Sequence, residues 1–165
     1  MDRSHDQAVM DTMRDAGARK ADEAAERAIR YFQEGYCCSE SVVRSILELY
    51  APSVPVETLM PLASGFCGGM GDRNGVCGVF SGGVLVLGHF MGRRHSGESD
   101  REVRRLAGEF QSRLKEESKG ALICRDILKD MRFTNWNKRG CRRLTGLGAM
   151  MVAELIEENG LVPRP

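Results

Sequence analysis

Aromatic residues are scarce in this sequence, and its charges are nearly balanced. Phe, Trp and Tyr together make up 6% of the 165 residues, so the chain lacks the stacking side chains on which single-stranded nucleic acid binds. A formal net charge of +1 predicts no strong attraction to nucleic acid or to an anionic membrane surface. We therefore expect no nucleic acid and no membrane among its partners.

The sequence also lacks a signal peptide and a convincing membrane span. Residues 1–30 are rich in Asp, Glu and Arg and contain no continuous apolar stretch. The most apolar segment, residues 75–91, contains several glycines and is shorter than the roughly twenty residues that a spanning helix needs. A buried helix in a bundle explains this segment better. We expect the protein to be cytoplasmic, where thiols are kept reduced and cysteines serve as ligands or redox groups.

Several common site motifs are absent as well. No C-x-x-C occurs, so neither a zinc knuckle nor a ferredoxin-type motif is present, and no C-x-x-C-H could attach a haem. The glycine-rich stretch 65–71 lacks the G-K-[ST] ending of a P-loop, and no strand precedes it to support a dinucleotide fingerprint. No Ser/His/Asp or paired-carboxylate arrangement points to hydrolysis. These patterns leave open whether the protein is an enzyme.

The patterns that are present are helical. They predict an all-α fold: one compact bundle over residues 1–165, with about six to seven helices and a glycine-rich loop before a central buried helix. Residues 1–18 have the weakest pattern, and we expect them to be frayed or involved in homo-oligomerisation. Ser99 and Glu102 match a capping box at one helix start. The first helix is expected to end at residue 35. The later helices are expected to cover residues 39–50, 55–64, 77–91, 99–117, 124–131 and 141–158.

The six cysteines are the most informative feature of the sequence. Four of them lie in or just before the first turn of an expected helix: Cys38, Cys77, Cys124 and Cys141. Three of the four lie on the apolar stripe of their helix, and the helix that follows Cys77 is apolar nearly all round. Cys37 falls on a solvated face instead. Of the adjacent pair, only Cys38 is therefore expected to point inward.

Helix N-termini suit thiolates, because their unpaired N–H groups and partial positive charge stabilise a negative charge. Several such ends converging on one point would hold a thiolate-ligated iron–sulfur cluster, which carries net negative charge. Basic residues near two of the cysteines would add to this stabilisation: Arg125, Lys138, Arg139, Arg142 and Arg143. Cysteine is also a common small hydrophobe in protein cores, so a purely structural role stays open.

The residues around these cysteines resemble a known family. Gly68-Gly69-Met70-Gly71 together with the later Cys77-Gly78-Val79-Phe80-Ser81-Gly82 looks like the central signature of the redox-active family named C_GCAxxG_C_C. The segments that resemble its other elements are Cys38-Ser39-Glu40-Ser41-Val42, Cys124-Arg125-Asp126-Ile127-Leu128 and the helix after Cys141. The resemblance covers roughly residues 27–158 and implies a small helical redox-active protein. A similar domain of split-Soret cytochrome c associates its cysteines with an iron–sulfur centre.

Two positions depart from the family's pattern. Val79 stands where the family usually has Ala, which is a packing change. Cys67 stands where its members more usually have Gly. A thiol at this position would be an extra ligand, a disulfide partner of Cys77, or idle. We expect it to be idle.

The first hypothesis is an iron–sulfur protein for electron transfer or redox sensing. Its metal ligands would be Cys38, Cys77, Cys124 and Cys141, with Cys67 as an extra candidate. The glycines that would let the backbone approach the cofactor are Gly68, Gly69, Gly71 and Gly78. The second hypothesis is a metal-free protein that cycles the same cysteines between dithiol and disulfide. The third is a zinc-binding or structural helical interaction module. The sequence does not identify the redox partner protein.

Overall fold

The computed structural model describes residues 3–131 and 136–163, with side chains from Asp15 onward. Over these residues the chain forms eight α-helical segments, one 3-10 turn and no strand beyond an isolated bridge, which confirms the all-α fold. The segments are α1 (Arg3–Glu34), α2 (Cys38–Tyr50), α3 (Val56–Ser64), α4 (Cys67–Met70), α5 (Gly78–Met91), α6 (Arg101–Glu117), α7 (Cys124–Asp130), η1 (Trp136–Lys138) and α8 (Arg139–Glu158). Because α4 contains left-handed glycines, the other seven are the regular helices, in agreement with the expected number.

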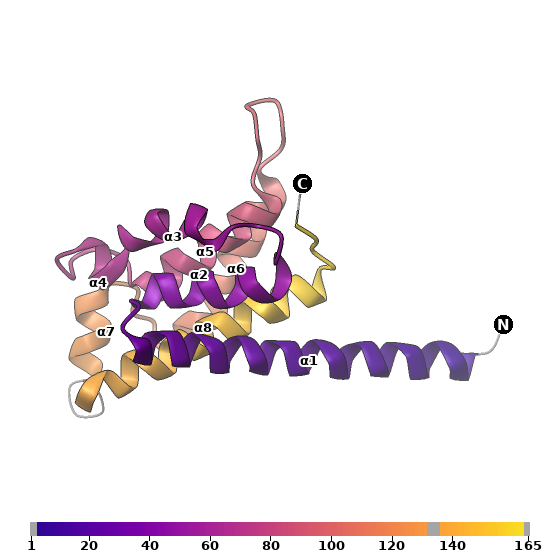
Figure 1. The fold of residues 1–165 in the computed structure, drawn as a ribbon, viewed down its shortest axis with the longest axis horizontal. Helices are drawn as coiled ribbons and strands as arrows, with labels where there is room; N and C mark the ends of the chain where they lie inside the picture. Colours follow the sequence, from indigo (N-terminus) through magenta and orange to yellow (C-terminus); the bar gives the residue numbers. More distant parts are fainter. Residues whose placement is uncertain (1–2, 132–135, 164–165) are drawn as a thin grey trace.

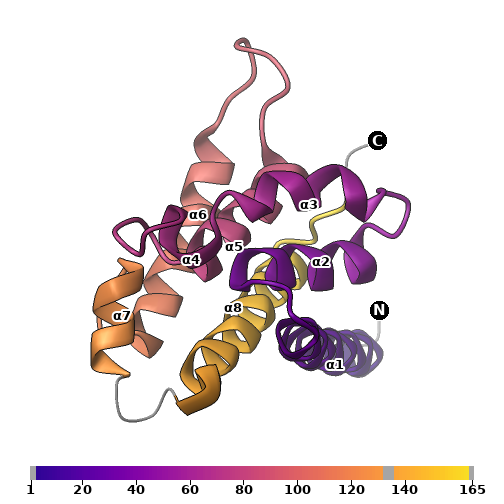
Figure 2. The same ribbon diagram turned by 60° about the vertical axis from the view of Figure 1, so that its left-hand side comes forward.

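Helices α1 and α8 run along the length of the molecule and pack against each other (Figures 1 and 2). Helix α2 packs on α1, α5 and α8, and α5 also contacts α6 and α8, so α5 lies in the middle of the bundle. Helix α1 extends past the body at its N-terminal end (Figure 1). The segment expected to be frayed is thus helical from Arg3 onward, and its role in oligomerisation stays a prediction.

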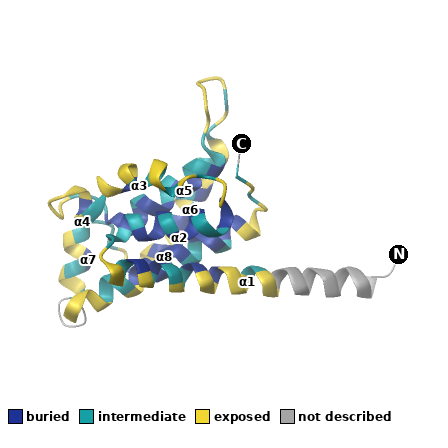
Figure 3. Cartoon of the chain, viewed as in Figure 1, coloured by how far each residue is buried: buried dark blue, intermediate teal, exposed yellow. Residues whose placement is uncertain are grey.

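The core lies around α5, as the apolar run predicted (Figure 3). The largest side chains buried there include Phe80 and Phe90 of α5 and Phe110 of α6. Among the described helices, none combines the length and the apolar character that crossing a membrane requires. The interpretation of residues 75–91 as a buried helix is therefore confirmed.

Glycines allow the central helices to approach closely. A Cβ at Gly82 of α5 would stand 2.8 Å from the carbonyl oxygen of Ser39 in α2. A Cβ at Gly83 would overlap the ring of Phe110, and one at Gly148 of α8 would overlap Val79. Helix α5 therefore lies almost backbone to backbone against α2, and this contact brings the start of α2 to the start of α5.

The helix boundaries differ from the predicted ones by at most two residues. Helix α6 begins at Arg101, after Asp100, and the expected capping box does not form. Ser99 instead accepts the N–H of Arg101 at 3.3 Å, and Glu102 pairs with Arg105 at 2.9 Å. The reason is that Asp100 occupies the cap position, one residue later than the pattern required.

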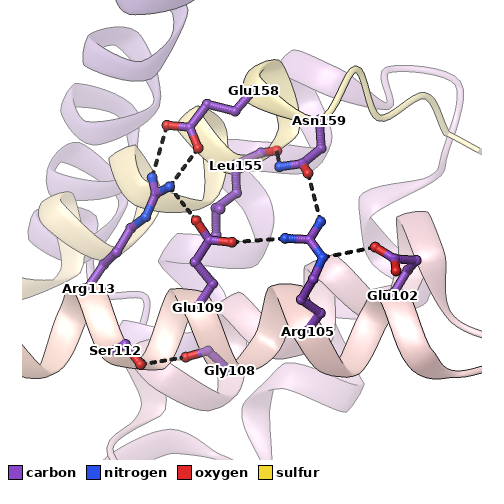
Figure 4. Close-up of polar contacts among 9 residues, drawn as sticks. All are labelled: Glu102, Arg105, Gly108, Glu109, Ser112, Arg113, Leu155, Glu158 and Asn159. Carbon is purple, nitrogen blue, oxygen red and sulfur yellow. Dashed lines mark hydrogen bonds and ion pairs between the residues drawn. The ribbon is translucent and has the colours of Figure 1, made fainter.

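On the outside, α6 is tied to α8 by ion pairs (Figure 4). Arg113 contacts Glu109 of its own helix and Glu158 of α8, each at 2.6 Å. Arg105 donates to Glu109 at 3.1 Å and to Asn159, the residue after α8, at 2.9 Å. These contacts are exposed or partly exposed, so solvent screens them and each adds little to stability.

Candidate thiol site

The structure separates the six cysteines into two sets. Cys37 and Cys67 form a disulfide with a Cα–Cα distance of 5.7 Å. The other four take part in no disulfide: Cys38, Cys77, Cys124 and Cys141. The expectation that Cys67 is idle is therefore wrong, and so is its pairing with Cys77. The physical reason is that the glycine-rich loop folds back onto the start of α2, where Cys37 meets Cys67.

The four cysteines outside the disulfide lie where the sequence predicted them, at helix starts. Cys38 and Cys124 are the first residues of α2 and α7, and Cys77 is the N-cap of α5. Cys141 is the third residue of α8, still within the first turn. Helices α4 and α7 lie at the end of the molecule where α8 begins, away from the N-terminus (Figures 1 and 2).

Cys38 and Cys77 form a directly interacting pair. The Cys77 thiol hydrogen-bonds to the Cys38 sulfur and, although burial opposes it, lowers the pKa of Cys38 to about 7. Backbone N–H groups, that of Gly68 foremost, lower the pKa of Cys38 further. The hydrogen bond to Cys38, then burial, raise the pKa of Cys77 well above its ordinary range. Near neutral pH, Cys38 is therefore partly thiolate and Cys77 is a thiol. Cys77 is buried, whereas Cys38 is half-buried.

The glycine-rich loop supplies the wall of this site. Gly68, Gly69 and Gly71 have positive φ angles of 61°, 66° and 95°, a conformation that disfavours other residues. Gly69 lies against α7, since a Cβ there would stand 2.5 Å from the Cβ of Cys124. Gly78 lies against α2 in the same way, because its Cβ would stand 2.5 Å from the Cys38 sulfur. The loop glycines thus let the backbone approach two of the free thiols.

The remaining thiols interact with this pair through charge. Burial raises the pKa of Cys124, and negative charge on Cys38 or Cys141 raises it further, whereas Arg73 lowers it. These mutual effects place Cys124 near both Cys38 and Cys141. The interactions connect all four cysteines.

Two of the five basic residues expected near the cysteines pair with other groups: Arg125 donates to Asn74 at 2.7 Å, and Arg143 pairs with Glu117 at 2.9 Å. For Lys138, Arg139 and Arg142 the stabilising role stays a prediction. A cation that lowers the pKa of Cys124 is Arg73, on the turn before α5. Sequence reasoning missed it, because only the tertiary fold brings this turn to the start of α7, where the N–H of Arg125 donates to the Arg73 carbonyl at 2.9 Å.

The donor set of the four cysteines outside the disulfide can be compared with what metals require. A tetrahedral zinc with bonds of about 2.3 Å places its sulfur ligands roughly 3.8 Å apart. Among the described residues, the one set of three or more metal-ligating side chains whose donor atoms all lie within 4.8 Å of one another is Cys37, Glu40 and Cys67. Among the described residues, no three of the other four thiols have sulfur atoms that all lie within 4.8 Å of one another. The side chains would therefore have to move together to hold a tetrahedral zinc.

Fold and site together define an all-α protein with a hydrogen-bonded pair of free thiols within a larger group of cysteines. The chain belongs to the C_GCAxxG_C_C family, whose sequence model is described as "Putative redox-active protein" and matches residues 36–155. All six cysteines lie within the matched range. No curated protein and no solved structure matches the chain. The resemblance noted in the sequence is therefore confirmed.

Proposed function

We propose that the protein is a thiol redox protein in which Cys38 and Cys77 interconvert between a dithiol and a disulfide. The observation that carries this proposal is that Cys38 and Cys77 shift each other's pKa where α2 and α5 begin, with the Cys38 sulfur against Gly78, the residue after Cys77. Half-buried Cys38 is the nucleophile, and buried Cys77 is the resolving thiol. Negative charge on Cys124 raises the pKa of Cys77 further.

The reaction proceeds in two exchange steps. The Cys38 thiolate attacks a disulfide of a partner protein, which forms a mixed disulfide and releases one partner sulfur as a thiolate. Cys77 then passes its proton to the thiolate released in the first step and attacks the Cys38 sulfur, which releases the second partner sulfur as a thiolate. The partner disulfide gains two electrons, and the Cys38–Cys77 pair loses them. In the reverse direction the pair is reduced by a dithiol.

The electrostatics of the pair support this order of events. In the dithiol state, the Cys38 sulfur raises the pKa of Cys77 and keeps it protonated. Once Cys38 is bonded to a partner sulfur, its negative charge is gone, and so is one of the causes that hold the proton on Cys77. Cys77 therefore becomes a better nucleophile at the moment when it is needed.

Disulfide mapping tests the proposal. The chain is oxidised mildly under anaerobic conditions, its free thiols are alkylated, and its peptides are analysed by mass spectrometry. We expect a Cys38–Cys77 linkage in addition to Cys37–Cys67, with Cys124 and Cys141 alkylated. Oxidation that leaves Cys38 and Cys77 unpaired, or that scrambles the pairs at random, would contradict the proposal.

An iron–sulfur cluster on the four cysteines outside the disulfide is the second candidate function. The observation that favours it is that charge effects link Cys124 to each of the other three thiols, while the remaining two cysteines are joined to each other. A bound cluster would supply one-electron transfer. The role of the protein's own residues would be to stabilise the ligating thiolates, as the N–H of Gly68 does for Cys38.

Metal and sulfide analysis separates the two candidates. Protein purified anaerobically is assayed for iron, acid-labile sulfide and zinc. Less than stoichiometric iron, even after reconstitution, eliminates the cluster. Stoichiometric iron and sulfide together with protection of Cys38 and Cys77 from alkylation would refute the dithiol proposal. Stoichiometric zinc instead would favour the structural module.

A further inference from the structure

A second set of potential ligands lies apart from the proposed Cys38–Cys77 pair. It consists of Cys37, Glu40 and Cys67, whose donor atoms all lie within 4.8 Å of one another. We propose that reduction of the Cys37–Cys67 disulfide opens a binding site for a thiophilic divalent cation, Zn²⁺ above all, held by these two sulfurs and the Glu40 carboxylate. The site uses neither sulfur of the proposed redox pair.

The carboxylate is held in place before any cation arrives. One Glu40 oxygen accepts the backbone N–H of Cys37 at 2.8 Å, and the other accepts the hydroxyl of Ser64 at 2.5 Å. Each oxygen keeps a further lone pair with which it can bind a cation. Cys37, Glu40 and Cys67 are all half-buried, so a small ion can reach them from solvent.

Ser39 keeps the two sulfurs together after reduction. Its oxygen lies 3.2 Å from the Cys37 sulfur and 3.5 Å from the Cys67 sulfur. The Ser39 hydroxyl donates its proton to the carbonyl of Ala63 at 2.8 Å, so its oxygen faces the sulfurs as an acceptor. Hydrogen bonds from the reduced thiols to this buried oxygen would hold both side chains turned toward the same place.

A dithiol reductant passes two electrons and two protons to the Cys37–Cys67 bond and becomes a disulfide itself. The cation then displaces the two thiol protons. The sulfurs separate to roughly 3.8 Å, as bonds of about 2.3 Å to a tetrahedral ion require. The Cα–Cα distance of 5.7 Å leaves the side chains room for this change.

The charge of the filled site suits its location. Two thiolates and one carboxylate around a divalent cation leave a net charge of −1. Cys37 is the N-cap of α2 and Glu40 is its third residue, so this charge lies at the partially positive end of a 13-residue helix. Three protein ligands leave the fourth tetrahedral position to water.

Cobalt titration tests the proposal, because Co²⁺ bound by thiolates gives a near-ultraviolet charge-transfer band. The full-length chain is titrated in its oxidised form, with four thiols verified by thiol counting, and after reduction with a phosphine that is then removed. We expect one additional equivalent of bound Co²⁺ in the reduced chain, displaced by Zn²⁺. The other four thiols are present in both samples, and the variants below separate their binding from that of the Cys37–Cys67 site.

Variants identify the ligands. Cys67→Ala and, separately, Cys37→Ala should abolish the additional equivalent. Glu40→Gln should weaken it about tenfold or more, since losing even an outer-shell partner of a metal ligand has that effect. Glu57→Gln, which changes an exposed carboxylate on α3, is the matched control and should bind as the unaltered chain does. The proposal fails if reduction adds no equivalent or if the added one survives both cysteine variants. Unchanged affinity in Glu40→Gln would remove the carboxylate from the site.

Discussion

Gly78 lies directly against Cys38: a Cβ at position 78 would stand 2.5 Å from the Cys38 sulfur. The same Cβ would stand 3.1 Å from the carbonyl oxygen of Phe66 and 3.2 Å from the backbone nitrogen of Ser39. The first residue of α5 is therefore enclosed by the start of α2 and the segment before α4. The Cys38 sulfur can lie at the start of α5 because Gly78 has no side chain.

Gly78→Ala is expected to destabilise the protein and to disturb Cys38. Because backbone atoms surround the new methyl group, the clash should cost about 1–3 kcal/mol in the free energy of unfolding. Urea denaturation measures this cost. Gly88→Ala, in the same helix, is the control, since a Cβ at Gly88 meets nothing within 4 Å. Gly88→Ala should be neutral or stabilising by about 0.5–1 kcal/mol. Equal effects of the two changes would show that the contact with Cys38 has no consequence.

Alkylation of Cys38 should depend on pH with a midpoint of about 7, because only the thiolate reacts. The rate rises as pH passes through the pKa and levels off above it. Cys77→Ala removes the largest cause of the lowered pKa of Cys38, so the midpoint should move up toward about 8.5, the value for a free thiol. Cys77→Ser keeps a donor and should move it less. Mass spectrometry of the Cys38 peptide provides the rates, and a midpoint that Cys77→Ala leaves in place would contradict the assignment.

Gly69→Ala should cost more stability than Gly68→Ala. Both residues have left-handed backbone angles, which cost roughly 1–2 kcal/mol for other residues. Only at Gly69 would the Cβ also collide with a neighbour, at 2.5 Å from the Cβ of Cys124 and 2.9 Å from the carbonyl oxygen of Gly75. This collision should add about 1–3 kcal/mol to the loss in the free energy of unfolding. Denaturation of both variants under one set of conditions decides the order, and a greater loss in Gly68→Ala would be inconsistent with the loop geometry.

The Cys37–Cys67 disulfide should contribute stability that depends on redox conditions. It links positions 30 residues apart in the sequence. Closing a loop of that length in the unfolded chain is worth roughly 3–4 kcal/mol in the chain-entropy model. Cys67→Ser should therefore lower the free energy of unfolding of the oxidised protein by up to this amount. With a reductant present, Cys67→Ser and the unaltered chain should differ little. A difference that persists under reduction would belong to packing instead.

Glu48 should contribute to stability at neutral pH and lose this contribution in acid. Burial alone would raise the pKa of Glu48, but the hydrogen bond from Tyr31 and the ion pairs with Arg44 and Arg27 lower it overall. Its contribution is therefore present above its unfolded pKa of about 4.3 and is lost as pH falls through the lower folded value.

The variant Glu48→Gln measures this contribution. It should destabilise the protein by about 1–3 kcal/mol at pH 7, since hydrogen bonds to a charged group are lost, and the difference from the unaltered chain should shrink below about pH 4. Glu26→Gln, an exposed change on α1, is the control and should have a small effect. A difference that stays constant with pH would refute this role of Glu48.

The sequence was sufficient for the helices and for part of the site. Periodicity located every regular helix in the described residues. Helical phase separated Cys38, which packs against the core, from Cys37 at the cap, although both side chains are half-buried. The partner of Cys67 was not predictable, because it depends on how three left-handed glycines turn the loop back onto α2. The hydrogen bond between the Cys37 N–H and the Glu40 carboxylate could have been predicted, because the spacing of the two residues matches a capping box. The effect of Arg73 on the pKa of Cys124 was not predictable either, because only the tertiary fold brings the two residues together.

Three expectations stay predictions: the compartment, the exclusion of nucleic acid and membrane partners, and a redox partner protein.

The disulfide also ties together the two chain segments that surround the Cys38 sulfur. Cys37 immediately precedes Cys38, and Cys67 immediately precedes Gly68, whose N–H helps to hold the Cys38 thiolate. The acidity of Cys38 therefore depends in part on a bond in which it takes no part. Reduction removes this covalent tie and leaves the Ser39 contacts to hold the two segments, so we expect the pKa of Cys38 to rise. The redox state of one pair of sulfurs would then change how readily the other pair reacts.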